Sequence, residues 1–112
     1  MKVKVNSNNL IIKKKKDLSL IPLSNILYIE KFGNISVIKT KQHEFEVRIT
    51  LKDLVTLLPQ YFIRSHRSYI INTRLVTKLK HMKNDLYKVV FNIDDYDYAF
   101  LKKKEINKII ND

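Results

Sequence analysis

The sequence of 112 residues contains no cysteine and no tryptophan, one glycine and two prolines. Without cysteine the chain can form no disulfide and offers no thiolate to a metal ion. A nucleotide-binding loop that cradles phosphate needs several glycines, so a nucleotide-dependent enzyme is not expected. The chain has no run near the roughly 18 apolar residues of a membrane helix, and its first residues are not expected to be a signal peptide because they lack a long apolar segment. We therefore expect one soluble domain in the cytoplasm, with no membrane as a partner.

Positive charge is abundant: the chain has 22 lysine and arginine residues and 11 aspartate and glutamate residues, which gives a net charge of +11. Such an excess attracts polyanions through long-range steering and counterion release. Most of the basic residues are lysine, and the chain is also rich in asparagine and isoleucine, a composition that AT-rich coding sequences produce. Charge alone therefore favours a nucleic-acid partner only modestly over a basic domain without one.

Apolar and polar residues alternate along much of the chain, which predicts a mainly β protein. Residues 1–8 are polar and are expected to form an N-terminal arm or a lead-in strand before a domain of residues 9–112. Residues 10–12 are apolar and precede four lysines, a pattern typical of a protected edge strand. Residues 18–21 predict a second short strand.

The middle of the chain predicts a hairpin and a third strand. Residues 26–32 are rich in β-branched and aromatic side chains and run into Gly33-Asn34, a pair suited to a tight turn. Residues 35–40 form the expected return strand, and residues 43–49 alternate between apolar and charged side chains. These segments predict an antiparallel meander with one buried face.

A short helix is expected next, because Leu51, Leu54, Val55 and Leu58 have the spacing of one helical face and Thr50 can cap it. After the helix, three more strands are predicted over residues 75–82, 86–93 and 96–101. A C-terminal helix is expected to begin at Lys102.

The residues that could carry catalysis lack the partners that catalysis needs. His66 would require an orienting carboxylate and a nucleophile, and neither is signalled nearby in the sequence. Asp94, Asp95 and Asp97 lack the glycine and terminal glutamate of a calcium loop and are better read as a turn. We expect no enzyme, no metal site and no cofactor.

Aromatic side chains leave a second class of binding open. A domain that binds single-stranded nucleic acid or RNA would stack bases on exposed aromatic rings. Most aromatic residues here fall on strand faces expected to be buried, and Tyr69, Tyr96 and Phe32 are the exceptions left undecided.

Residues 62–72 read Phe-Ile-Arg-Ser-His-Arg-Ser-Tyr-Ile-Ile-Asn and set basic, hydrogen-bonding side chains between apolar anchors. Such a patch can present donors to phosphates and base edges. Together with Ile-Leu-Tyr-Ile-Glu at residues 26–30, the Gly33-Asn34 turn and the leucine helix, it resembles the LytTR DNA-binding domain of bacterial response regulators. The similarity covers about residues 9–110.

The resemblance implies a mainly β, elongated arrangement of small antiparallel sheets with short helices. It also implies a transcriptional regulator of two-component systems that binds double-stranded DNA at promoters. In that family, loops enter successive major grooves on one side of a bent duplex, often at direct repeats. Formation of a homodimer on the DNA is left open.

Carried over by position, three segments are expected to contact DNA. The first loop, residues 31–34, offers Lys31 and Asn34, and the second loop offers His66, Arg67 and Ser68. Asn72 is expected to hold the turn that follows the second loop. The basic segment, Lys102 and Lys103, enters the last helix.

The basic segment departs from the family pattern, which often has Pro-Val-Ser-Arg where this chain has Ala-Phe-Leu-Lys at residues 99–102. Lysine lacks the planar fork with which arginine contacts guanine. Lys102 is therefore expected to contact phosphate, and Arg67 is the candidate base reader.

Two further questions stay open at the level of sequence. Most relatives carry an N-terminal receiver domain, so both a stand-alone regulator and a piece of a longer protein are compatible with a domain that starts near Met1. An interaction module that never binds DNA is also an alternative, although the basic loops argue weakly against it.

Overall fold

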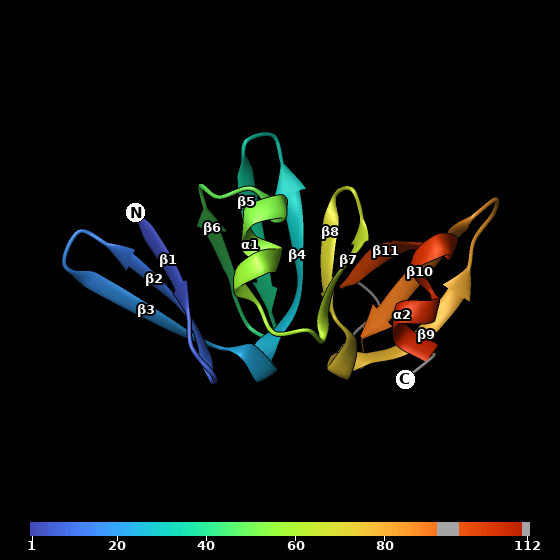
Figure 1. Ribbon diagram of the computed structural model, residues 1–112, viewed down its shortest axis with the longest axis horizontal. Coiled ribbons are helices and arrows are strands. Elements are labelled where there is room, and N and C mark those ends of the chain that lie inside the picture. Colours follow the sequence, from blue (N-terminus) through green and yellow to red (C-terminus); the bar gives the residue numbers. More distant parts are fainter. Residues whose placement is uncertain (92–96, 111–112) are drawn as a thin grey trace.

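Three small antiparallel sheets lie in a row along the long axis of the molecule (Figure 1). The computed structural model describes residues 1–91 and 97–110. The Cα positions extend over 46 × 27 × 25 Å. This elongated, mainly β arrangement with short helices confirms the fold expected from the sequence.

The first sheet has the order β1-β2-β3 and contains β1 (Lys2–Val5), β2 (Asn9–Lys14) and β3 (Asp17–Pro22). The expectation that residues 10–12 belong to an edge strand was wrong, because β1 pairs with β2 and makes β2 the central strand. Val3 and Val5 of β1 pack against the core, which explains why this polar segment is a strand.

The central sheet has the order β6-β5-β4-β8-β7. Its strands are β4 (Ile26–Phe32), β5 (Ile35–Thr40), β6 (Glu44–Val47), β7 (Phe62–His66) and β8 (Tyr69–Asn72). The expected meander is confirmed as β4, β5 and β6. The hairpin between β4 and β5 turns at Gly33, whose φ of +60° favours glycine. The strand β8 then pairs antiparallel with β4 and extends the sheet.

The third sheet has the order β11-β10-β9 and contains β9 (Val76–His81), β10 (Leu86–Phe91) and β11 (Tyr98–Lys102). The expected helix start at Lys102 was wrong: Lys102 pairs with Leu86 and ends β11. A 3-10 helix, η3 (Lys103–Glu105), follows, and α2 (Asn107–Ile110) completes the chain's described part. Ile93, the turn at Asp94 and Asp95, and Tyr96 lie outside the described residues.

Two further 3-10 helices join the sheets. The first, η1 (Leu23–Asn25), connects β3 to β4, and the second, η2 (Thr73–Leu75), connects β8 to β9. The turn that follows Asn72 is therefore η2.

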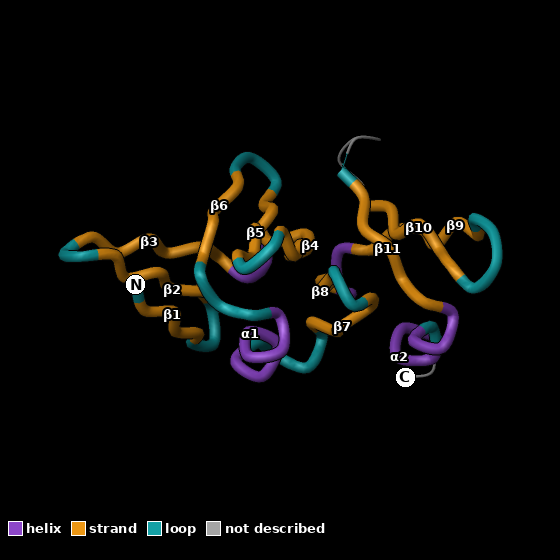
Figure 2. The backbone as a smooth tube through the Cα atoms, turned by 90° about the horizontal axis from the view of Figure 1, so that it is seen from above, coloured by secondary structure: helices purple, strands orange, loops and turns teal. Residues whose placement is uncertain are grey.

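The central sheet has cores on both faces, and α1 (Leu51–Leu57) lies over one of them (Figure 2). Leu54 of α1 packs in one core with Ile29 of β4 and Leu10 of the first sheet. The other core joins the central sheet to the third sheet and includes Tyr28 and Phe91. Burial on both faces explains the unbroken apolar run at the start of β4. Because both faces of the sheet are packed, the strands that lead into the hairpin turns are held in fixed positions.

The helix α1 begins as its sequence predicts. The Thr50 hydroxyl accepts a hydrogen bond from the Asp53 amide at 3.1 Å and caps the first turn. Leu51 and Leu54 are buried within the helix, and Leu58 is buried just after its end.

Candidate nucleic-acid interface

The first and second loops lie side by side at one end of the central sheet (Figure 1). Their strands β4 and β8 are paired neighbours, with Glu30 opposite Tyr69. The Lys31 amide donates to the Ser68 carbonyl at 2.9 Å, which carries the pairing into the loops themselves. Two segments more than 30 residues apart in sequence therefore form one rigid edge.

The basic segment joins this edge through β7 and β11. The Ser65 hydroxyl, which is fully buried, donates to the Phe100 carbonyl at 2.8 Å. A groove of about 510 Å³ lies between the second loop and the start of η3. We call it the basic groove; its lining residues are Arg64, Ser65, His66, Arg67, Lys102, Lys104 and Glu105.

The expected contact residues divide between this groove and a second hollow. His66, Arg67 and Lys102 line the basic groove together. Lys31 and Asn34 instead line a smaller hollow of about 210 Å³ beside the start of α1. Ser68 lies in the turn between β7 and β8, and its backbone carbonyl accepts the bond from Lys31. Lys103 lies in neither hollow, and its amide donates to the Asp85 carbonyl at 2.9 Å.

Arg64 is not among the contact residues expected from the sequence, although it lines both hollows. Its Nε donates to the His66 carbonyl at 3.0 Å, and its Nη2 donates to the Arg67 carbonyl. The second loop therefore folds around a guanidinium group, whose pKa is lowered by partial burial. An arginine three residues before the Arg67-Ser68 turn was the sequence signal for this role.

His66 is oriented by the backbone of its own loop. Its Nδ1 accepts a hydrogen bond from the Ser68 amide at 3.0 Å, so the neutral ring carries its proton on Nε2. Burial lowers the pKa of His66, and the positive charges of Lys102, Arg67 and Arg64 lower it further. Near neutral pH the ring is thus an uncharged donor.

His66 also packs edge-on against Tyr69, with ring centroids 5.7 Å apart. Tyr69 is one of the aromatics left undecided, and it is buried, with its hydroxyl donating to Glu30 at 3.0 Å. Burial and this bond raise the pKa of Tyr69 to about 12. Tyr69 therefore packs beneath the second loop and bonds the strand that leads into the first loop. Its ring is not available for stacking on a base.

Asn72 holds the far end of β8, as expected. Its Nδ2 donates to the carbonyls of Leu23 and Ile26 at 3.2 and 3.0 Å, and its Oδ1 accepts from the Arg74 amide at 3.0 Å. The side chain is almost completely buried. It ties together the entry to β4 and the turn into η2.

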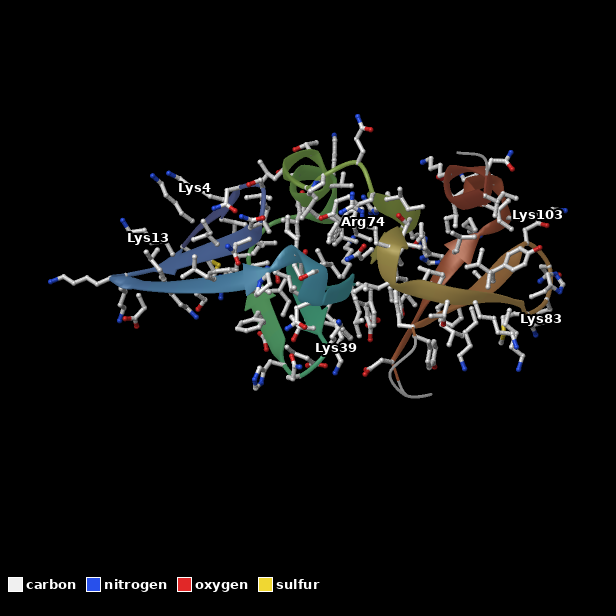
Figure 3. All side chains as sticks on the ribbon, turned by 90° about the horizontal axis from the view of Figure 1, so that it is seen from below. Lys4, Lys13, Lys39, Arg74, Lys83 and Lys103 are labelled. Atoms are coloured by element: carbon white, nitrogen blue, oxygen red, sulfur yellow. The ribbon has the colours of Figure 1, made fainter. Side chains whose placement is uncertain are left out.

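Basic side chains are spread over the whole length of the molecule (Figure 3). Lys4 and Lys13 lie on the first sheet, and Lys83 and Lys103 lie at the opposite end. The bond from Lys103 to Asp85 places the β9–β10 turn, with Lys83, next to the basic segment. Net charge therefore does not single out one surface of the molecule, whereas pairing brings the first and second loops together on one edge.

Other kinds of site receive no support from the described residues. Over residues 1–91 and 97–110, no group of His, Asp and Glu is arranged to hold a metal ion. In the same residues no helix is long and apolar enough to cross a membrane.

Basic loops fixed to a scaffold of small sheets are an arrangement suited to binding nucleic acid. A family model of the LytTr DNA-binding domain matches residues 16–110 of this chain. The chain therefore belongs to the LytTR family of DNA-binding domains, as its resemblance indicated.

Known proteins of this kind are similar to the chain in sequence and in fold. The transcriptional regulatory protein LytR of Staphylococcus aureus strain N315 is 35% identical over 74 residues, which are 65% of this chain and 30% of LytR. The transcriptional regulatory protein NatR of Bacillus subtilis strain 168 is 32% identical over 71 residues, 62% of this chain and 30% of NatR. The matched region thus spans about 30% of the length of these relatives.

A solved LytTr DNA-binding domain from Bacillus cereus has the same fold. It superposes with a TM-score of 0.79 over 96% of this chain and 100% of that chain, at 16% sequence identity. The arrangement of three sheets is therefore shared although most residues differ.

Proposed function

We propose that this domain binds double-stranded DNA in a sequence-specific manner, through the first loop, the second loop and the basic segment. The observation that carries the proposal is the rigid connection between them: Lys31 to Ser68, and Ser65 to Phe100. Major grooves recur on one side of a duplex about every 34 Å. The long axis of the molecule, 46 Å, exceeds this distance, which supports contact along more than one groove.

Each contact residue has a role that its chemistry supports. Arg67 is exposed and keeps the planar fork that matches guanine O6 and N7. Lys31, Lys102 and Lys103 are exposed ammonium groups suited to phosphates. His66, Ser68 and Asn34 supply neutral hydrogen-bonding groups between these charges.

We extend the proposal to the protein that contains this domain. It is a transcription regulator that works in the bacterial cytoplasm at promoter sites, needs no cofactor and catalyses no reaction. The names of the LytR and NatR relatives support regulation of transcription. Activation through a receiver domain, as in two-component systems, and binding of two copies to direct repeats belong to the same proposal.

Selection from a random duplex library tests the central claim. We expect a defined sequence to be enriched and to outcompete random duplexes, single strands and structured RNA of equal length. A preference for single strands or RNA would instead support a base-stacking β domain. Failure to bind any duplex at low salt would favour a protein-interaction module.

A further inference from the structure

Phe32 is a large apolar side chain that the fold leaves in solvent. Its exposed fraction is 54%, whereas the exposed fraction of Tyr28 and of Tyr69 is 9%. Phe32 is the last residue of β4, directly before the turn at Gly33. Burying such a ring stabilises a folded chain, so its exposure in a proposed contact loop is a feature to explain.

The two faces of the β4–β5 hairpin carry different chemistry at its tip. Side chains alternate along a strand, so Phe32 lies on the face of Tyr28 and Glu30, and Lys31 lies on the opposite face with Ile29. Lys31 borders the hollow beside α1, together with Lys52. The tip therefore presents a cation on one side and an aromatic ring on the other.

The register of the sheet places Phe32 beside the second loop. Glu30 pairs with Tyr69, and the Lys31 amide bonds the Ser68 carbonyl. Phe32 follows Lys31 directly, at the end of β4. The exposed ring therefore lies where the first loop leaves the second loop and forms the hairpin tip.

The tip also has a shape that suits the major groove. The strand β8 pairs with β4 no further than Glu30, and β6 pairs with β5 from Ser36 onward. In Figure 1 the β4–β5 turn extends beyond both neighbouring strands. The major groove, about 12 Å wide, admits a two-stranded β-ribbon, whereas the minor groove is about 6 Å wide. Apolar wedges that separate base pairs act from the minor groove, so this tip is placed for contact with base edges.

We propose that Phe32 is a specificity-determining residue that packs against the 5-methyl group of a thymine in the major groove that the first loop enters. The inference rests on the proposed DNA binding. A phenyl ring forms no hydrogen bond with base edges, and the thymine methyl is the apolar feature of the major groove. The ring therefore discriminates by burying that methyl.

Replacing single thymines by deoxyuridine tests the proposal, because only the 5-methyl group is lost. On the enriched duplex, we expect the native protein to lose about fourfold in affinity at one or two positions, the factor for about one buried methylene-sized group. Phe32→Ala should lose a similar factor on the thymine duplex and should bind both duplexes equally. Phe32→Leu, which keeps apolar bulk, should retain the discrimination.

Leu18→Ala is the matched control, since Leu18 is 58% exposed but lies on β3 in the first sheet. It should leave affinity and thymine discrimination unchanged. If Phe32→Ala still distinguishes thymine from deoxyuridine, or binds the enriched duplex as tightly as the native protein, the Phe32 proposal is overturned while DNA binding stands. If no duplex is enriched at all, both proposals fall.

Discussion

At the scale of single residues, Arg67 and Lys102 line the same groove but differ in what they can recognise. We expect Arg67→Ala to weaken binding to the enriched site by about 1–3 kcal/mol and binding to random DNA only slightly. Lys102→Ala should weaken both and reduce the salt slope by about one. Titrations at several salt concentrations measure both effects.

Arg74→Ala is the control for the Arg67 experiment. Arg74 lies beyond the far end of β8 from the second loop, and its guanidinium stacks 3.7 Å from the Tyr61 ring centroid. Its removal deletes an equal charge without touching the loops. Equal losses from Arg67→Ala on specific and random duplexes would refute base reading by Arg67.

His66 couples the stability of the second loop to pH. Its pKa in the folded chain is lowered from 6.5, so the unfolded chain takes up the proton first as the pH falls. The free energy of unfolding should therefore decrease from about pH 7.5 through 6.5 and stop responding to this group below the folded pKa. Denaturant titrations at pH 7.5 and 5.5 should show a smaller decrease for His66→Gln than for the native protein. An identical decrease would contradict this account.

At the scale of elements, the β7–β8 turn depends on Arg64. Its guanidinium donates to two successive carbonyls from two different nitrogens, and the single nitrogen of lysine cannot occupy both positions. We expect Arg64→Lys to lower the free energy of unfolding by about 1–2 kcal/mol and to weaken specific DNA binding more than nonspecific binding. Faster amide exchange at Arg67 and Ser68, with unchanged exchange in β4 and β5, would locate the effect. Exchange that accelerates uniformly would show general destabilisation instead.

Elements whose sequence signals lie within a few residues were predictable. Elements whose structure depends on pairing with a distant strand were not. The alternation in residues 43–49, the turn at Gly33 and the cap at Thr50 act within a few residues of sequence. Lys102 follows a different rule, because pairing with Leu86 holds it in a strand where local propensity favours a helix. The central position of β2 likewise depends on its pairing with β1, whose mostly polar sequence does not predict a strand clearly.

At the scale of the whole molecule, sequence alone could not reveal which strand faces are covered. Alternation puts Phe32 and Tyr69 on one face of adjacent strands, yet packing buries Tyr69 and leaves Phe32 exposed. The same holds for the contact loops: their positions in sequence came from the resemblance, but their connection through Ser65 and Arg64 depends on sheet packing. The family pattern therefore supplied the proposed contact residues, and the tertiary structure shows how their loops are held together.

The length of the molecule limits how two copies can share one duplex. Copies at direct repeats face the same side of DNA only when the repeats are separated by whole turns of 10–10.5 base pairs, about 34–36 Å. One turn is shorter than the 46 Å long axis, along which the three sheets are arranged. Two copies one turn apart would therefore overlap, whereas two turns leave room for both.

We expect joint occupancy to be greatest at a repeat spacing of about 21 base pairs and to fall at about 10 and 15. Gel-shift titrations on duplexes with these spacings measure it, and full occupancy at 10 base pairs would show that the long axis does not follow the DNA.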